Sequence, residues 1–150
     1  MDRIRFITRA VCVASAVWSA VCAAVAAFLL SDVPLAQGES IMAAGLALDA
    51  GIAYAVAGSI MFFAAVYSFG VCLYGMRCIR LVRGMDALRG VSLFGAGLFL
   101  VSLVACLVVG RLNDVGWIAF VAAAALFSLA SLAGEMSRAL IAACMRGGDR

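Results

Sequence analysis

The chain contains no histidine and no lysine, and Pro34 is its only proline. Imidazole is the commonest metal ligand in proteins, a frequent haem ligand and the usual proton shuttle near neutral pH. The absence of histidine therefore excludes a bis-histidine haem subunit and a histidine-based catalyst. Charged residues are also scarce, because they make up 13% of the 150 residues, whereas about a quarter is usual in a soluble domain.

Apolar residues dominate the composition instead. They account for 67% of the chain, and the mean hydropathy is +1.19. A water-soluble fold of this length has too little interior to hide so much apolar surface. The composition therefore predicts that the chain resides in a lipid bilayer.

Six cysteines are present, and no two of them have the CxxC spacing of a thiolate metal site or a redox pair. The sequence therefore predicts no metal and no cofactor. Most of the cysteines lie in apolar runs, which favours a role as small hydrophobic side chains packed between helices. Acylation of Cys78 or Cys144 near a membrane edge is the alternative.

Four segments are long and apolar enough to cross a bilayer as helices, which need about 20 apolar residues each. The sequence predicts an all-α, integral membrane four-helix bundle that forms a single membrane domain over residues 1–150, with short hairpins between helices 2 and 3 and between helices 3 and 4. Helices 2, 3 and 4 are expected to extend into the cytoplasm. The predicted spans are residues 10–30, 50–76, 90–110 and 115–134.

The first segment has a basic flank like that of a signal peptide. Its apolar run is longer than the usual 7–15 residues of such peptides, so we expect an uncleaved first helix. Arginine is strongly biased between alternate loops, and only Arg111 lies on the minority side. Because arginine marks the cytoplasmic side of short loops, both termini are predicted in the cytoplasm. The arginine-only, alanine-rich composition favours a bacterial cytoplasmic (plasma) membrane. The ten majority-side arginines are Arg3, Arg5, Arg9, Arg77, Arg80, Arg83, Arg89, Arg138, Arg146 and Arg150.

The arginine block between helices 2 and 3 is predicted to contact anionic lipid head groups, and nucleic acid is not an expected partner. The predicted lipid contacts are Arg77, Arg80, Arg83 and Arg89. Gly84 is expected to end helix 2 and Asp86 to cap helix 3. The apolar stretch at residues 40–48 is expected to form an interfacial helix or to extend helix 2, and its loop is the best candidate for an external contact.

Small residues recur at helical spacing, and such residues let membrane helices approach closely. We predict that six of them pack between helices. They are Ser15, Ser19, Gly95, Ser102, Ser128 and Ser131. Phenylalanines are expected to face lipid or a partner, with Phe62, Phe63, Phe94 and Phe99 as the examples.

The middle of each predicted span contains no charge, and no nucleophile–base pair is apparent. The leading hypothesis is a non-enzymatic structural, accessory or regulatory subunit that works through helix–helix contacts with another membrane subunit or with further copies of itself. Glu135 lies at the predicted cytoplasmic boundary, where it is expected to form an ion pair with Arg138 or Arg9. The alternative is a small oligomeric transporter or channel with Glu135 as the coupling carboxylate.

Two stretches, "ALRGVSLFGAGLFLVSLV" at 87–104 and "LAGEMSRAL" at 132–140, carry a resemblance to a known family. They resemble parts of a bacterial family of four-helix membrane proteins of unknown function that is often paired with Cro/CI-like regulators. The resemblance implies a four-helix membrane fold, and it implies no reaction and no catalytic residues.

Overall fold

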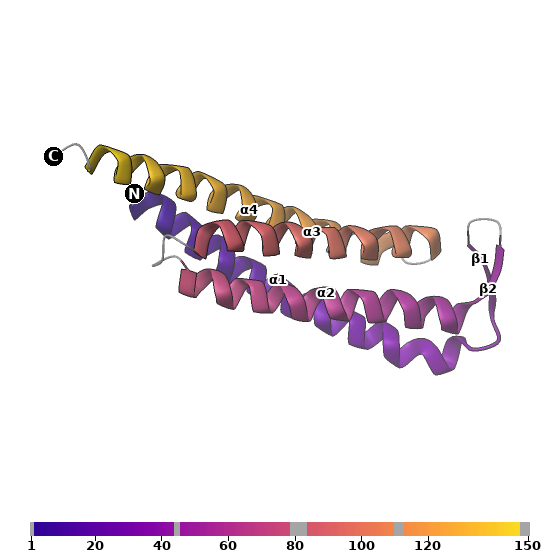
Figure 1. Ribbon diagram of the computed structural model, residues 1–150. Helices are drawn as coiled ribbons and strands as arrows, with labels where there is room; N and C mark the ends of the chain where they lie inside the picture. Colours follow the sequence, from indigo (N-terminus) through magenta and orange to yellow (C-terminus); the bar gives the residue numbers. More distant parts are fainter. Residues whose placement is uncertain (1, 44–45, 79–83, 110–112, 148–150) are drawn as a thin grey trace.

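The computed structural model describes residues 2–43, 46–78, 84–109 and 113–147, which form four long helices and one short β-hairpin (Figure 1). The predicted all-α four-helix bundle is confirmed, and each helix is long and apolar enough to cross a membrane. The elements are α1 (Asp2–Ala36), β1 (Ser40–Ala43), β2 (Leu46–Asp49), α2 (Ala50–Cys78), α3 (Gly84–Val109) and α4 (Asn113–Gly147).

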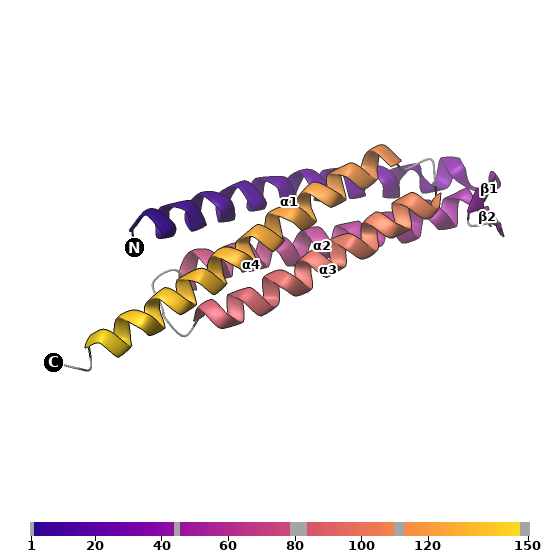
Figure 2. The same cartoon turned by 90° about the horizontal axis from the view of Figure 1, so that it is seen from above.

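The helices form two antiparallel hairpins, α1–α2 and α3–α4, which pack on each other as two layers (Figure 1). Seen from above, α4 crosses over the bundle and continues past the start of α3 (Figure 2). The two ends of the chain lie at the same end of the bundle, and the β-hairpin lies at the other (Figure 1).

The first helix is longer than its predicted span of residues 10–30, and it continues through Pro34 to Ala36. Proline lacks an N–H donor and crowds the preceding turn, so Pro34 weakens the last turn, and α1 ends two residues later at Ala36. Gly38 follows with a φ of 89°, a left-handed conformation that reverses the chain direction. At 1.5 Å per residue α1 is about 50 Å long, so its ends project beyond a hydrocarbon core of about 30 Å.

The expectation of a helix at residues 40–48 is wrong, because β1 and β2 pair antiparallel there, with Ser40 opposite Asp49. Successive side chains of a β-strand point to opposite faces of the hairpin. Ile41 is buried in the cluster that includes Cys106 and Val109 at the end of α3, whereas Met42 is 79% exposed. The hairpin therefore closes this end of the bundle by placing an apolar side chain against α3.

Asp49 explains why helix 2 does not extend back into the hairpin. Its carboxylate accepts hydrogen bonds from the backbone N–H of Gly51 at 2.8 Å and of Ile52 at 3.3 Å, as a helix N-cap does. The other carboxylate oxygen accepts from the N–H of Gly38 at 3.1 Å. One side chain thus starts α2 and anchors the turn that follows α1.

We expect stability to depend on pH through this carboxylate. The Gly38 hydrogen bond, supported by those from Ile52 and Gly51, lowers the pKa of Asp49 below its usual 3.8. A lowered folded-state pKa stabilises the fold above the unfolded-state pKa, and this contribution disappears as the pH falls through the lowered value. Thermal unfolding in detergent should show Asp49→Ala to be less stable than the native chain near neutral pH, with the difference shrinking in acid.

Asp49→Asn is the matched control, because the amide oxygen can still cap α2 but the group does not titrate. The Asn variant should lose less stability than the Ala variant near neutral pH. Its own stability should lack the fall in acid that protonation of Asp49 causes in the native chain, so its deficit should also shrink as the pH falls. An Ala variant whose deficit persisted unchanged in acid would contradict the role given to Asp49.

Gly84 does not end helix 2 as predicted but begins α3, while α2 is described to Cys78. Asp86 lies in the first turn of α3 instead of capping it from outside. Its carboxylate accepts a hydrogen bond of 2.8 Å from the hydroxyl of Ser137 on α4. Asp86 therefore connects α3 with α4. The spacing of residues along a single helix does not predict a contact of this kind.

Phe99 is fully buried and is the largest side chain that the core encloses, so the expectation that it faces lipid or a partner is wrong. It lies four residues after Gly95 and three before Ser102, which places all three on the same buried face of α3. Phe62, Phe63 and Phe94 are exposed on the outer surface, as predicted. Phenylalanine thus occurs both in the buried core and on the outer surface of this bundle.

Candidate functional site

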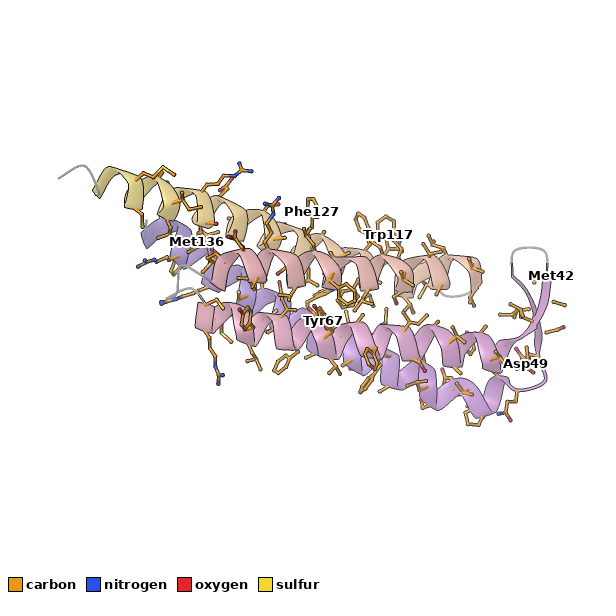
Figure 3. The ribbon with its side chains drawn as sticks, viewed as in Figure 1. Met42, Asp49, Tyr67, Trp117, Phe127 and Met136 are labelled. Atoms are coloured by element: carbon orange, nitrogen blue, oxygen red, sulfur yellow. The ribbon has the colours of Figure 1, made fainter. Side chains whose placement is uncertain are left out.

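The charged side chains gather at the two ends of the bundle. The end with the chain termini, called the basic end below, carries Arg3, Arg5, Arg9, Arg77, Arg89 and Arg138 together with Asp86 and Glu135. The described charged residues of the hairpin end are Asp32, Glu39, Asp49 and Asp114. Met136 marks the basic end in Figure 3 and Asp49 the opposite end, and most of the nitrogen atoms lie toward Met136.

Hydroxyl groups connect α1 and α2 in the uncharged middle of the bundle. The hydroxyls of Ser19 and Ser68 are hydrogen-bonded at 2.7 Å, and Ser19 also donates to the carbonyl of Ser15 at 2.7 Å. Ser15, Ser92 and Ser102 are buried, and their hydroxyls have no hydrogen-bond partner among the described residues. The fully buried polar side chains in the described middle of the bundle are therefore hydroxyls, whereas the buried Nε of Arg5 lies near the start of α1.

Gly95 lies where α3 meets both α2 and α4. A Cβ at this position would be 2.9 Å from Leu126 Cδ1 and 3.2 Å from Tyr67 Cε1. The structure thus places Ser15, Ser19, Gly95 and Ser102 in the interior. Ser128 and Ser131 do not share this placement. Both are exposed on α4 and donate to carbonyls of their own helix, so the prediction that they pack between helices is corrected.

Three side chains that sequence reasoning missed connect the two hairpins. Trp18 donates its indole N–H to the carbonyl of Ile118 at 3.1 Å. Tyr67 donates to the carbonyl of Val91 at 3.2 Å, and Thr8 to Met136 Sδ at 3.3 Å. Their sequence signal is general, since a Trp or Tyr inside an apolar span needs an acceptor for its polar hydrogen.

The first groove at the basic end lies between α1 and α2 and has a volume of about 450 Å³. Arg9 and Val13 of α1 and Met76 and Arg77 of α2 line it, and both arginines are exposed. We call it the Arg9–Arg77 groove. The sequence predicts separate roles for these two residues, with Arg9 as an ion-pair partner of Glu135 and Arg77 as a lipid contact.

The second groove, called the α3–α4 groove, has a volume of about 430 Å³. It brings together Arg89, Glu135 and Arg138, and an apolar floor continues from them toward Phe127 and Leu93. Arg89 passes over Gly134, where a Cβ would be 3.5 Å from Arg89 Cδ.

The three residues of the predicted boundary ion pair therefore do not share one site. Arg138 shares the groove of Glu135, but Arg9 lines the other groove. Within the described part of the chain, no ion pair joins Glu135 to either arginine. Arg80 and Arg83, two of the predicted lipid contacts, lie outside the described residues, whereas Arg77 and Arg89 line separate grooves.

The cysteines are all unpaired, and five of them are buried, including Cys78. Burial removes Cys78 as an acylation site, whereas Cys144 is exposed on α4. Over residues 2–43, 46–78, 84–109 and 113–147, no three side chains of the metal-ligating types come together.

These features describe a small integral membrane protein with an uncharged interior and two arginine-lined grooves at one end. Comparison with models of protein families, with curated proteins and with solved structures finds no match to this chain.

Proposed function

We propose that the chain is a non-enzymatic subunit of a bacterial cytoplasmic membrane, with a structural, accessory or regulatory role exerted through helix–helix contacts. The observation that carries this proposal is the interior of the bundle. In its described spans, apolar side chains and a few hydroxyls fill the interior, and the charged groups stand at the ends. A transport route needs ionisable groups or a polar cavity that reaches the middle of the membrane, whereas a subunit needs only a stable bundle with an apolar outer surface.

The outer surface supports a role in helix contacts. Phe63 on α2 and Phe127 on α4 are 76% and 60% exposed, and Phe28 on α1 is 65% exposed. Photo-cross-linking in native membranes tests which of these faces meets a protein. A photoreactive residue in place of one of the three phenylalanines should give an adduct of one defined polypeptide mass, whereas a probe at buried Ala122 should give none. Adducts with lipid alone at all three faces would overturn the subunit proposal.

The orientation is part of the proposal, and the distribution of arginine supports it. We expect an impermeant thiol reagent to label Met42→Cys from outside intact cells, in a chain whose native cysteines are replaced. A chain that retains only Cys144 should react after the cells are opened. The reverse pattern would place the termini outside.

A small oligomeric transporter or channel is the second candidate, and the α3–α4 groove is the observation that favours it. There Glu135 faces an arginine-lined depression at the edge of the span. In the subunit, Glu135→Gln should change the free energy of unfolding by about 0–1 kcal/mol, as exposed charges usually do. In a proton-coupled transporter, the same change should abolish flux while the fold survives.

We expect the first outcome in paired measurements of thermal stability and of proton flux in proteoliposomes. Arg138→Gln is the matched control, because it removes a charge from the same groove without removing the carboxylate. A flux in the native protein that vanishes in Glu135→Gln and persists in Arg138→Gln would promote the transporter.

A further inference from the structure

The Arg9–Arg77 groove concentrates positive charge in one place on the basic end. Arg9 reaches it from α1 and Arg77 from α2, and none of the described residues that line it is acidic. Two exposed guanidinium groups offer ten N–H donors in two planar forks, a geometry suited to phosphate oxygens. The groove therefore has the charge and the donors of an anion site.

The same groove changes from charged to apolar in the direction of the membrane. Val13 follows Arg9 by four residues on α1, which is a rise of about 6 Å toward the hairpin end on the same helix face. Met76 precedes Arg77 on α2 and is likewise nearer the membrane. Both apolar side chains are exposed to the surroundings of the bundle.

Close packing fixes the distance between the two helices beside the groove. A Cβ at Gly75 would lie 3.0 Å from Cys12 Sγ, and both residues are buried. The glycine therefore lets α1 and α2 approach next to the two arginines. The helix contact thus holds the backbones of Arg9 and Arg77 on adjacent helices beside the groove.

We propose that the Arg9–Arg77 groove binds one anionic phospholipid, with its phosphate between the two guanidinium groups and an acyl chain along Val13 and Met76. A free phosphate would use the arginines and leave the apolar half of the groove empty. A phospholipid matches both halves in the order in which they occur along the membrane normal. This inference does not rest on the proposed function.

The α3–α4 groove is the weaker site for such a ligand. It also combines arginines with an apolar floor, but the Glu135 carboxylate shares it and repels a phosphate. The two grooves lie at the same end of the bundle, so one serves as an internal control for the other.

Native mass spectrometry of the full chain in a neutral detergent tests the proposal. Phosphatidylglycerol is titrated against phosphatidylcholine, and we expect one phosphatidylglycerol to be retained in preference. Arg9→Gln and Arg77→Gln should each weaken its binding about fivefold, which corresponds to about 1 kcal/mol for one basic side chain at an anionic head group. The double variant should lose about 25-fold. Arg138→Gln, from the other groove, should change binding by less than about twofold.

Two further measurements separate a lipid from a free anion. Val13→Trp fills the apolar half of the groove and keeps both charges, so it should weaken phosphatidylglycerol binding. Inorganic phosphate in millimolar excess should not displace the lipid. Displacement by phosphate, or an unchanged Val13→Trp, would reassign the groove to a free anion and overturn the proposal.

Equal losses in Arg138→Gln and Arg77→Gln would also overturn it, because they would show diffuse attraction to the whole basic end. Circular dichroism of each variant confirms that the helices remain folded. The substituted side chains are exposed, so the double variant should keep the helicity of the native chain.

Discussion

Replacing Phe99 by alanine is expected to lower the free energy of unfolding by about 3–5 kcal/mol, which is the usual cost of truncating a buried aromatic side chain. Phe99 is completely buried and is the largest such residue in the core. Its removal leaves a cavity in the core cluster to which all four helices contribute side chains. Chemical denaturation in detergent micelles, followed by circular dichroism, would measure the loss.

Phe94→Ala is the matched control on the same helix. Phe94 is 61% exposed and stacks edge-on against Tyr67, with ring centroids 5.3 Å apart. Such an aromatic pair contributes about 0.5–1.5 kcal/mol, so this variant should be clearly more stable than Phe99→Ala. Equal losses in the two variants would mean that Phe99 is not the central core residue.

The second large effect is expected at Gly95. Gly95→Leu adds four carbon atoms where even a Cβ would be 2.9 Å from Leu126 Cδ1. Overpacking of this kind costs about 1–3 kcal/mol in well-packed cores. The displaced Tyr67 ring would also lose its hydrogen bond to the carbonyl of Val91, which contributes about 1 kcal/mol more. The thermal midpoint in detergent should fall accordingly.

Gly97→Leu tests the same exchange two residues further along α3. A Cβ at Gly97 meets nothing within 4 Å, and leucine favours helix formation over glycine by close to 1 kcal/mol. We therefore expect Gly97→Leu to be neutral or slightly stabilising. A loss as large as that of Gly95→Leu would show that both faces of α3 are packed.

The four helices were predictable because a long uncharged run has one stable form in a bilayer. Which face of each helix points inward was harder to predict. In water the buried face is the apolar one, but in lipid both faces are apolar. The prediction for Phe99 was wrong for this reason, because an aromatic side chain can face either the lipid or the interior of the bundle. The row of small residues on either side of it, Gly95 and Ser102, was the better guide.

The hairpin was missed for a local reason. Residues 40–48 are rich in alanine and leucine, which favour helices by propensity. The outcome depends instead on the left-handed Gly38 and on the Asp49 carboxylate, which stops α2 at Ala50. The pairing of Arg9 with Arg77 was missed for a different reason, because it depends on which helices are neighbours, and periodicity along a single helix does not contain that information.

The two-layer arrangement of hairpins has a consequence for biosynthesis. The most extensive contacts in the bundle are between consecutive helices, α1 with α2 and α3 with α4. At a synthesis rate of about 5–20 residues per second, the first hairpin leaves the ribosome about 4–14 s before the second is complete. It can enter the bilayer and pair internally during that interval. Maturation then reduces to one docking event between two preformed halves, in which Trp18 and Tyr67 find the carbonyl groups of the later half.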